Sequence, residues 1–308
     1  MKSLKIVFFG TPEFAKVSLD AIYKSNHQVV GVVTVADKPV GRGQKISQSP
    51  VKSYALENNL PLYQPEKLRS SEFLDEMKEL QADLFVVVAF RMMPKLLFEM
   101  PRLGTFNLHG SLLPDYRGAA PINFAIINGE EKTGVTTFFI NEKIDEGNLL
   151  LQAELPISND ENAGSLHDRL MVLGAELVVK TIDGLAENSL TELPQPNVEN
   201  PKNAFKIFKE DTEINWSLPS KKIYDFVRGM SPYPCAYTTI SIGDEKKSLK
   251  IFSGKYDKLD NPKSLGKLEF SKNEMKIYTT DGVFFPLEVQ LEGKKRMDIK
   301  SFLNGFQK

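Results

Sequence analysis

The N-terminal third of the chain alternates short apolar runs with helix-like stretches, and this alternation limits the possible folds more than any other feature. Near-continuous apolar runs occupy residues 5–9, 29–35 and 84–89, and helical patterns occupy 13–24 and 71–80. Strands that are apolar on both faces are typical of a parallel sheet covered by helices on both sides. We therefore predict an α/β domain built on a doubly wound, mostly parallel sheet.

The first strand-to-helix turn, Gly10-Thr11-Pro12, lacks the glycine fingerprint of a dinucleotide site. That fingerprint needs three glycines, for the turn, for the approach to the pyrophosphate and for helix packing. Only Gly10 is present, and Pro12 stands where the backbone would have to approach the pyrophosphate. The turn therefore disfavours a nicotinamide or flavin cofactor, and with it a dehydrogenase.

A proline-rich stretch separates this domain from the C-terminal third of the chain. An amphipathic helical pattern covers 165–185, and residues 190–204 then have the composition of a linker. Alternating segments with turns between them follow, which favour a small β-barrel. We predict a domain at 1–189 and a second domain at 205–308, joined by that linker.

Composition fits a reducing, aqueous compartment. Cys235 is the only cysteine, so the chain cannot form an internal disulfide. No apolar run reaches the roughly 18 residues of a membrane span, and the apolar run 6–9 stops too early for a secretory signal. We expect a cytoplasmic protein without a membrane segment, and nothing in the sequence requires more than a monomer.

Charge differs between the two parts of the chain. Residues 1–208 hold 21 basic and 26 acidic side chains, whereas 209–308 hold 18 and 14. A weakly basic C-terminal third is compatible with phosphate-bearing ligands. A chance fluctuation of a few charges would give the same difference.

Residue spacing singles out Asn107 and His109 as candidates for chemistry. The chain has three histidines; we expect His27 at the surface because it lies in a polar turn, and His167 in solvent because it lies off an apolar helical stripe. Period-two alternation over 105–109 puts Asn107 and His109 on the same face of a short strand. That strand ends at the edge where open α/β sheets bind their ligands.

These residue types suit the stabilisation of a tetrahedral oxyanion. Asparagine offers an amide donor and histidine a proton that can be switched near neutral pH. Asp145, in a glycine-containing turn, is the best carboxylate to orient the imidazole or to accept a proton. Ser111 is a conceivable nucleophile, although no G-x-S-x-G elbow surrounds it. Spacing alone leaves open that Asn107 and His109 cap backbone groups and that Asp145 only forms a turn.

Residues 109–122, HGSLLPDYRGAAPI, resemble the signature of the folate-dependent formyltransferases. Within that family, HGSLLP followed by RGAAPI is most similar to the members that act on methionyl-tRNA. Other similar segments cover essentially the whole chain, at residues 8–14, 37–45, 133–136, 214–216, 228–234 and 293–297. The resemblance implies a Rossmann-like formyltransferase domain followed by an OB-like, tRNA-binding domain.

The resemblance also assigns roles to positions of this chain. The family's catalytic trio falls on Asn107, His109 and Asp145. Its folate-contacting run falls on Ser111, Leu112, Leu113 and Pro114. Its acceptor-stem loop falls on 37–49, where Arg42 is expected to reach the acceptor end of the tRNA. Lys206 and Lys209 are weaker candidates for phosphate contacts.

One segment departs from the family pattern. Residues 89–94, AFRMMP, replace a small glycine-containing segment that family members often carry. By resemblance this segment lines the pterin pocket, so the shape of that pocket is expected to differ.

The implied reaction transfers the formyl group of 10-formyltetrahydrofolate to the α-amino group of methionyl-initiator tRNA, with no metal required. The nearest alternative is a related formyltransferase that acts on glycinamide ribonucleotide or an amino sugar, although a small acceptor would need neither the second domain nor the basic loop. A nucleic-acid-binding module on an α/β scaffold would fit the OB-like domain. It would leave Asn107, His109 and Asp145 unexplained.

Overall fold

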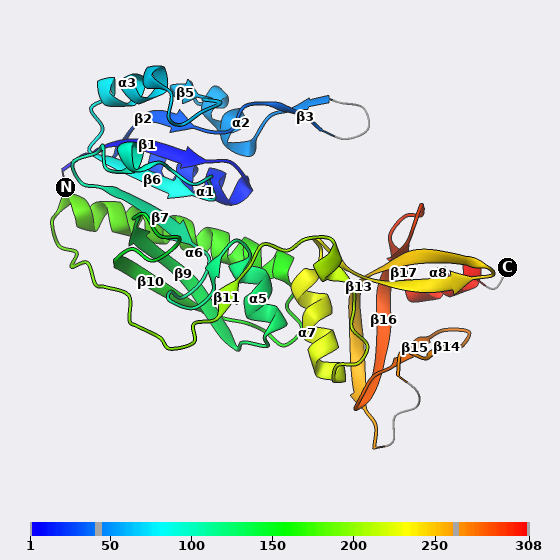
Figure 1. The fold of residues 1–308 in the computed structure, drawn as a ribbon. Coiled ribbons are helices and arrows are strands. Elements are labelled where there is room, and N and C mark those ends of the chain that lie inside the picture. Colours follow the sequence, from blue (N-terminus) through cyan, green and yellow to red (C-terminus); the bar gives the residue numbers. More distant parts are fainter. Residues whose placement is uncertain (1, 41–44, 261–264, 307–308) are drawn as a thin grey trace. The chain divides into compact units, whose positions relative to one another are not determined.

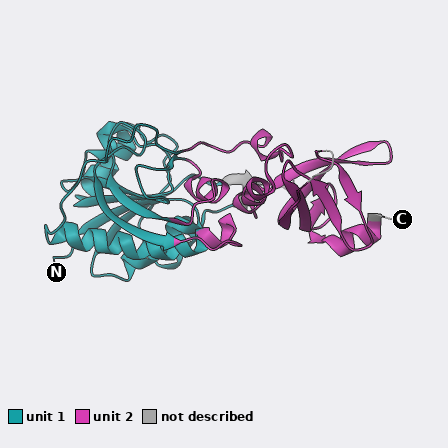
Figure 2. Ribbon diagram, turned by 90° about the horizontal axis from the view of Figure 1, so that it is seen from below, with its two compact units in different colours: residues 1–118, 133–155, 167–202 teal, residues 119–132, 156–166, 203–308 magenta. Residues whose placement is uncertain are grey.

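The computed structural model describes residues 2–40, 45–260 and 265–306. The chain divides into two compact units (Figure 2): unit 1 comprises residues 1–118, 133–155 and 167–202, and unit 2 comprises residues 119–132, 156–166 and 203–308. Among the helices of the described ranges, none combines the length and the apolar character needed to cross a membrane.

Unit 1 is built on a seven-stranded sheet with the strand order β10-β9-β7-β6-β1-β2-β5 (Figure 1). The strands are β1 (Lys5–Gly10), β2 (Gln28–Val33), β5 (Leu62–Tyr63), β6 (Leu84–Val88), β7 (Thr105–His109), β9 (Lys132–Phe139) and β10 (Leu149–Pro156). Neighbouring strands from β5 to β7 pair in parallel, and β9 runs antiparallel to β7. The predicted doubly wound, mostly parallel sheet is therefore confirmed.

Helices cover both faces of this sheet, which explains why its central strands β1, β2 and β6 are almost continuously apolar. On one face, Val7 and Phe9 of β1 join a buried cluster with Phe73 of α3 (Ser71–Glu79) and Leu97 of α4 (Lys95–Phe98). Because successive strand residues point to opposite faces of the sheet, Leu108 of β7 faces the side opposite this cluster. There a Cβ added to Gly174 of α6 (Ala163–Ala186) would lie 2.8 Å from the Leu108 side chain. Helices α1 (Glu13–Tyr23) and α2 (Pro50–Glu57) complete the unit.

The expectation that His27 lies at the surface is wrong. The residue is only 6% exposed, and both ring nitrogens are used. Nδ1 accepts a hydrogen bond from the Leu4 amide at 3.2 Å, and Nε2 lies 3.0 Å from the Asp183 carboxylate. The turn before β2 reads as polar because these groups pair with each other, not because they face water.

Unit 2 contains a curled antiparallel sheet with the strand order β12-β13-β16-β15-β14, with β17 paired to β16. Its strands are β12 (Ala236–Ile242), β13 (Glu245–Lys258), β14 (Leu268–Phe270), β15 (Met275–Tyr278), β16 (Gly282–Leu291) and β17 (Met297–Asp298). Irregular pairing between Ile251 and Gly254 bends the long strand β13. At Gly254 a Cβ would lie 2.1 Å from the Phe284 ring, so only glycine allows this approach. The predicted small OB-like barrel is confirmed.

Two helices close the core of this sheet. Helix α7 (Ser220–Met230) buries Ile223, Val227 and Met230 at helical spacing, and α8 (Ile299–Phe306) contributes Phe302 and Leu303 to the same cluster. The short helix α5 (Pro121–Ile127) also belongs to unit 2, where Asn123 donates a hydrogen bond to the Gly229 carbonyl at 2.8 Å. Strand β11 (Asn203–Ala204) begins the C-terminal part of the unit.

A buried ion pair fixes α7 within unit 2. The Asp225 carboxylate is 2% exposed and lies 2.9 Å from Nε of Arg228, which is itself nearly buried. Arg228 also donates to the Glu161 carbonyl at 2.9 Å, and Lys221 approaches Asp225 from the exposed side at 2.6 Å. Removing the carboxylate would leave a buried guanidinium with no counter-charge among these contacts.

We predict that Asp225→Ala destabilises unit 2 by about 3–5 kcal/mol, the cost of breaking a buried pair from one side. Trp216, the single tryptophan of the chain, packs 5.8 Å from Phe284 in this core. Its fluorescence during urea unfolding of the full chain reports on unit 2.

Lys221→Met is the matched control, because the Lys221 side chain is 46% exposed and surface pairs contribute at most about 1 kcal/mol. Equal midpoints for Asp225→Ala and Lys221→Met would contradict the assignment of a structural ion pair.

Candidate active site

Asn107 and His109 lie together at the carboxyl end of β7, as their spacing predicts. In the register with β9, Asn107 is opposite Phe138 and His109 is opposite Thr136. The neighbouring strands β6 and β1 run parallel to β7 and end at the same edge. This is the edge at which open α/β sheets bind ligands.

The His109 ring is held in one orientation. Its Nε2 lies 2.8 Å from the Tyr116 carbonyl oxygen. A carbonyl only accepts hydrogen bonds, so Nε2 must carry the proton. Nδ1 faces Asp145 Oδ2 at 3.8 Å, and only 7% of the His109 side chain is exposed. That distance is too long for a direct hydrogen bond, which leaves Nδ1 able to contact a bound ligand.

Asp145 follows β9 in a tight turn and adopts a left-handed conformation, with φ of 54°. Its Oδ2 accepts a hydrogen bond from the Gly118 amide at 2.9 Å. Among the described residues, no donor contacts Oδ1. Two positions later a Cβ on Gly147 would lie 1.6 Å from the Phe139 carbonyl, which explains why this turn contains glycine.

The Asn107 carboxamide is the free polar group of the site. Asn107 is half-buried, and within the described part of the chain its side chain makes no hydrogen bond. Its Nδ2–H is therefore available to donate to an oxygen of a bound molecule.

Residues 116–118 contact both His109 and Asp145. The Tyr116 carbonyl accepts from the imidazole, and the Gly118 amide donates to the carboxylate. Tyr116 and Gly118 have positive φ angles of 62° and 121°, so this short segment has a specific, unusual backbone. It sets the separation between the two side chains.

The run predicted to contact folate is partly buried in the protein. Ser111 and Leu113 are 0% and 3% exposed, and the Ser111 hydroxyl donates to the Asp115 carbonyl at 2.6 Å. That hydroxyl is therefore not available as a nucleophile. Leu112 and Pro114 are half-buried and retain surface that a ligand could contact.

The segment at 89–94 is held by hydrogen bonds to the backbone of residues 65–66. Ala89 has a positive φ of 47°, and Arg91 donates to the carbonyls of Glu66, at 2.9 Å, and Pro65. Met93 is buried at 7% exposure, whereas Met92 is 73% exposed. Beside the end of β6, this departure from the family pattern therefore exposes one flexible apolar side chain.

Arg42, predicted to reach the tRNA, lies outside the described residues. The base of its loop is anchored: Asp37 contacts Lys52 at 2.6 Å and Gln64 at 3.1 Å, and the hydrogen bond from Lys52 lowers the pKa of the Asp37 carboxyl. Ser49 caps α2 through the Lys52 amide at 3.1 Å. Short paired strands β3 (Lys38–Val40) and β4 (Lys45–Ser47) lead into and out of the loop.

Lys206 and Lys209 lie on the surface of unit 2. Lys206 Nζ lies 5.2 Å from the centre of the Phe208 ring, and Phe205 and Phe208 are 70% and 56% exposed. Exposed cations beside exposed aromatic rings are a surface on which nucleic-acid backbones and bases can bind.

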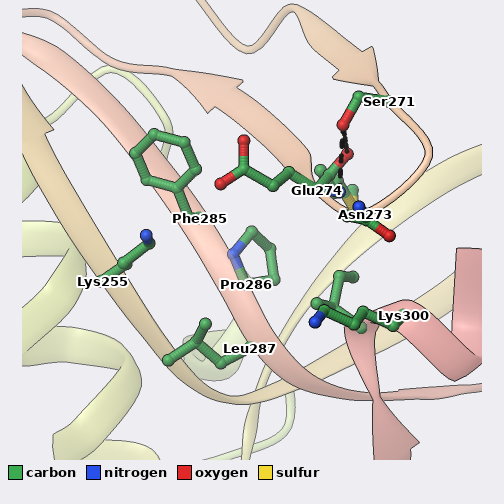
Figure 3. A pocket seen from close by; sticks show the side chains of 10 residues that line it. Lys255, Ser271, Asn273, Glu274, Phe285, Pro286, Leu287 and Lys300 are labelled. Atoms are coloured by element: carbon green, nitrogen blue, oxygen red, sulfur yellow. Dashed lines mark hydrogen bonds between the residues drawn. The ribbon is translucent and has the colours of Figure 1, made fainter.

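A separate pocket of about 500 Å³ lies on the barrel of unit 2 (Figure 3). Lys255, Phe285, Pro286 and Lys300 are among its lining residues, and Lys255 stacks on the Phe285 ring at 5.1 Å. It contains no histidine and none of the candidate residues of β7. Across the described ranges, histidine, cysteine, aspartate and glutamate form no cluster that could hold a metal ion.

Three groups contribute to the site in ways that the sequence does not reveal. Two of them are backbone groups, and the third is a side chain in a stretch whose composition is misleading. The Tyr116 carbonyl and the Gly118 amide act through the backbone, which any residue possesses. Gln195 donates to the carbonyls of Asp145 and Gly147 at 2.8 and 2.9 Å. It lies in the proline-rich stretch whose composition predicts only a linker.

Solved structures share the fold. The N-formyltransferase from Helicobacter canadensis, in complex with folinic acid and dTDP-3-aminofucose, aligns with a TM-score of 0.68 at 23% identity, over 92% of this chain and 98% of that one. A glycinamide ribonucleotide transformylase from Symbiobacterium toebii aligns with a TM-score of 0.53 at 18% identity, over 62% and 94%.

Sequence comparisons give closer relatives. Residues 4–182 match the Formyl transferase family model, and residues 206–307 match the Formyl transferase, C-terminal domain model. The methionyl-tRNA formyltransferase of Flavobacterium johnsoniae is 51% identical over 99% of this chain and 97% of its own length. That of Bacteroides fragilis is 46% identical over 99% and 96%. The chain therefore belongs to the methionyl-tRNA formyltransferase family of formyl transferases.

Proposed function

We propose that this protein transfers the formyl group of 10-formyltetrahydrofolate to the α-amino group of methionyl-initiator tRNA, for translation initiation. Relatives named methionyl-tRNA formyltransferase match 99% of the chain, and this observation carries the proposal. The geometry supports it, because Asn107, His109 and Asp145 lie together at the ligand-binding edge of the sheet.

In the proposed mechanism, the amine nitrogen attacks the formyl carbon, and the carbonyl oxygen becomes an oxyanion. Asn107 Nδ2–H and the protonated Nδ1 of His109 donate to that oxygen. The Tyr116 carbonyl keeps Nε2 occupied, so Nδ1 is the ring nitrogen that reaches the substrate. Donors that are already oriented cost no reorganisation when charge develops.

Asp145 accepts the proton that the attacking amine loses. Its Oδ2 is held by the Gly118 amide, and Oδ1 is the oxygen that takes the proton. The oxyanion then re-forms the carbonyl as the bond between the formyl carbon and the folate nitrogen breaks. The proton that Asp145 took passes to the leaving folate nitrogen, which restores the carboxylate. The carboxylate also stabilises the charged imidazole across the 3.8 Å gap.

The remaining assignments follow the same resemblance. Leu112 and Pro114 contact the folate, with Ser111 and Leu113 supporting them from within the protein. Arg42 contacts the acceptor end of the tRNA, and Lys206 and Lys209 contact phosphates. We place the protein in the cytoplasm, as a monomer with a catalytic domain at 1–189, a linker at 190–204 and a tRNA-binding domain at 205–308.

A formyltransferase specific for a small amine is the second candidate, since such enzymes share this fold. The purified protein would be incubated with 10-formyltetrahydrofolate and one acceptor at a time: charged initiator tRNA, glycinamide ribonucleotide or an amino sugar nucleotide. We expect formylation of the charged tRNA alone. Faster transfer to a small amine would reject the proposed acceptor.

We predict that Asn107→Ala and His109→Ala each lower the single-turnover rate by about 10²–10³, the usual loss for one oxyanion donor. Binding of charged tRNA, measured by filter retention, should stay near the wild-type value. His167→Ala is the matched control, because the His167 side chain is 37% exposed and, within the described residues, forms an ion pair only with its neighbour Asp168. A near-normal rate in either site variant would contradict the assigned roles.

We predict that Arg42→Ala raises the KM for charged tRNA at least about tenfold, while the KM for 10-formyltetrahydrofolate changes little. A charge-assisted phosphate contact contributes about 1.5–3 kcal/mol, which corresponds to a loss of this size. Arg69→Ala, an exposed arginine of unit 1 outside the loop, controls for a general loss of positive charge. Equal increases in both KM values would be evidence against the acceptor-loop role.

A further inference from the structure

The stretch predicted to be a linker is attached to the turn that carries Asp145. Leu193 pairs with Leu149 at the start of β10, through backbone hydrogen bonds of 2.7 and 3.0 Å. Beside this bridge, Glu192 accepts a hydrogen bond from Asn148 at 2.8 Å. Across residues 191–200, Gln195 alone is not exposed. One side chain of the stretch is thus turned into unit 1.

The Gln195 carboxamide is fully used. Nε2 donates to the carbonyls of Asp145, at 2.8 Å, and Gly147, at 2.9 Å. Oε1 accepts from Nε and Nη2 of Arg117, at 3.1 and 2.7 Å. The carbonyls can only accept and the guanidinium can only donate, so the amide cannot be flipped without losing all four contacts.

The contacts fall on the part of the turn that most needs support. Asp145 has a φ of 54°, a conformation that disfavours a residue with a Cβ and persists only where surrounding contacts fix it. Gly118 holds the carboxylate of this residue, and Gln195 holds its carbonyl. Backbone and side chain of Asp145 are therefore fixed by separate donors.

Arg117 links these two donors. It directly precedes Gly118 in the chain, and its guanidinium orients Gln195 while lying 3.5 Å from the Glu146 carboxylate. The hydrogen bonds therefore form a closed network: Arg117 contacts Gln195, Gln195 contacts the 145–147 turn, and Asp145 in that turn contacts Gly118, the residue after Arg117.

We propose that Gln195 is a positioning residue for formyl transfer, which holds the 145–147 turn so that the Asp145 carboxylate faces His109 Nδ1 and the amine. This inference rests on the proposed function. Gln195 touches no substrate; it acts through Asp145. The proline-rich stretch is thereby part of the active-site structure and not only a connection between domains.

Gln195→Met keeps the length of the side chain and removes all four hydrogen bonds. We expect its kcat to fall by about 10- to 100-fold, the scale of a misplacement of about 1 Å in an active site, with both KM values within about twofold of wild type. Gln195→Glu keeps an acceptor for Arg117 but sets a carboxylate oxygen against two carbonyls. It should lose at least as much kcat, which separates holding the turn from holding Arg117.

Glu192→Ala is the matched control, because it removes the neighbouring contact to Asn148 and leaves the Asp145 carbonyl untouched. We expect wild-type kinetics from it. Wild-type thermal stability of Gln195→Met would confirm that the variant is folded.

A double-mutant cycle distinguishes positioning from a general structural effect. If Gln195 acts through Asp145, then adding Gln195→Met to Asp145→Ala should slow single-turnover transfer by less than about twofold. An additive loss, or a Gln195→Met enzyme with wild-type kcat, would overturn the proposal. Every rate is compared with the wild-type enzyme on the same charged tRNA, so a wild type that formylates no tRNA would instead reject the proposed function.

Discussion

The hydrogen bond from His109 Nε2 to the Tyr116 carbonyl is the contact on which the arrangement of the site depends. It fixes Nε2 as the donor of that bond, so the second nitrogen, Nδ1, is the one that can contact a ligand. The same short segment, residues 116–118, donates to Asp145 through Gly118. A change in the backbone of this segment would displace the Asp145 carboxylate and the His109 imidazole together, because both contact it.

The segment just before that loop, residues 111–114, is held by side chains of the antiparallel strands β9 and β10. Thr136, opposite His109 on β9, donates to the Ser111 carbonyl at 2.6 Å and accepts from the Leu113 amide at 3.1 Å. Gln152 of β10 donates to Thr136 and to the Leu113 carbonyl, at 3.0 and 2.9 Å. The 111–114 run is therefore held by hydrogen bonds to the buried Thr136 and to Gln152, which suits a site whose donors must be oriented before substrate arrives.

The sheet could be predicted because its signal is distributed over many residues. Burial on both faces makes β1, β2 and β6 almost continuously apolar, and the placement of Asn107 and His109 on one face follows from strand periodicity. His27 could not be placed, because a polar turn looks the same whether its groups pair with Asp183 or with water. Gln195 was hidden for a related reason. The prolines on either side predict a linker, but a linker composition does not show which side chain turns inward. That depends on a partner about 50 residues away in the sequence.

The left-handed backbone of Asp145 explains why so many polar groups contact the 145–147 turn. A left-handed aspartate costs roughly 1–2 kcal/mol relative to an ordinary conformation, and a glycine at 145 would remove this cost together with the carboxylate that we propose as the base. The chain instead keeps the side chain and stabilises its backbone with Gln195, while Gly147 allows the close approach to Phe139. If Asp145 is the base, its position depends on the contacts that Gln195 makes to the turn, so a loss of these contacts should reduce catalysis before it reduces the stability of the fold.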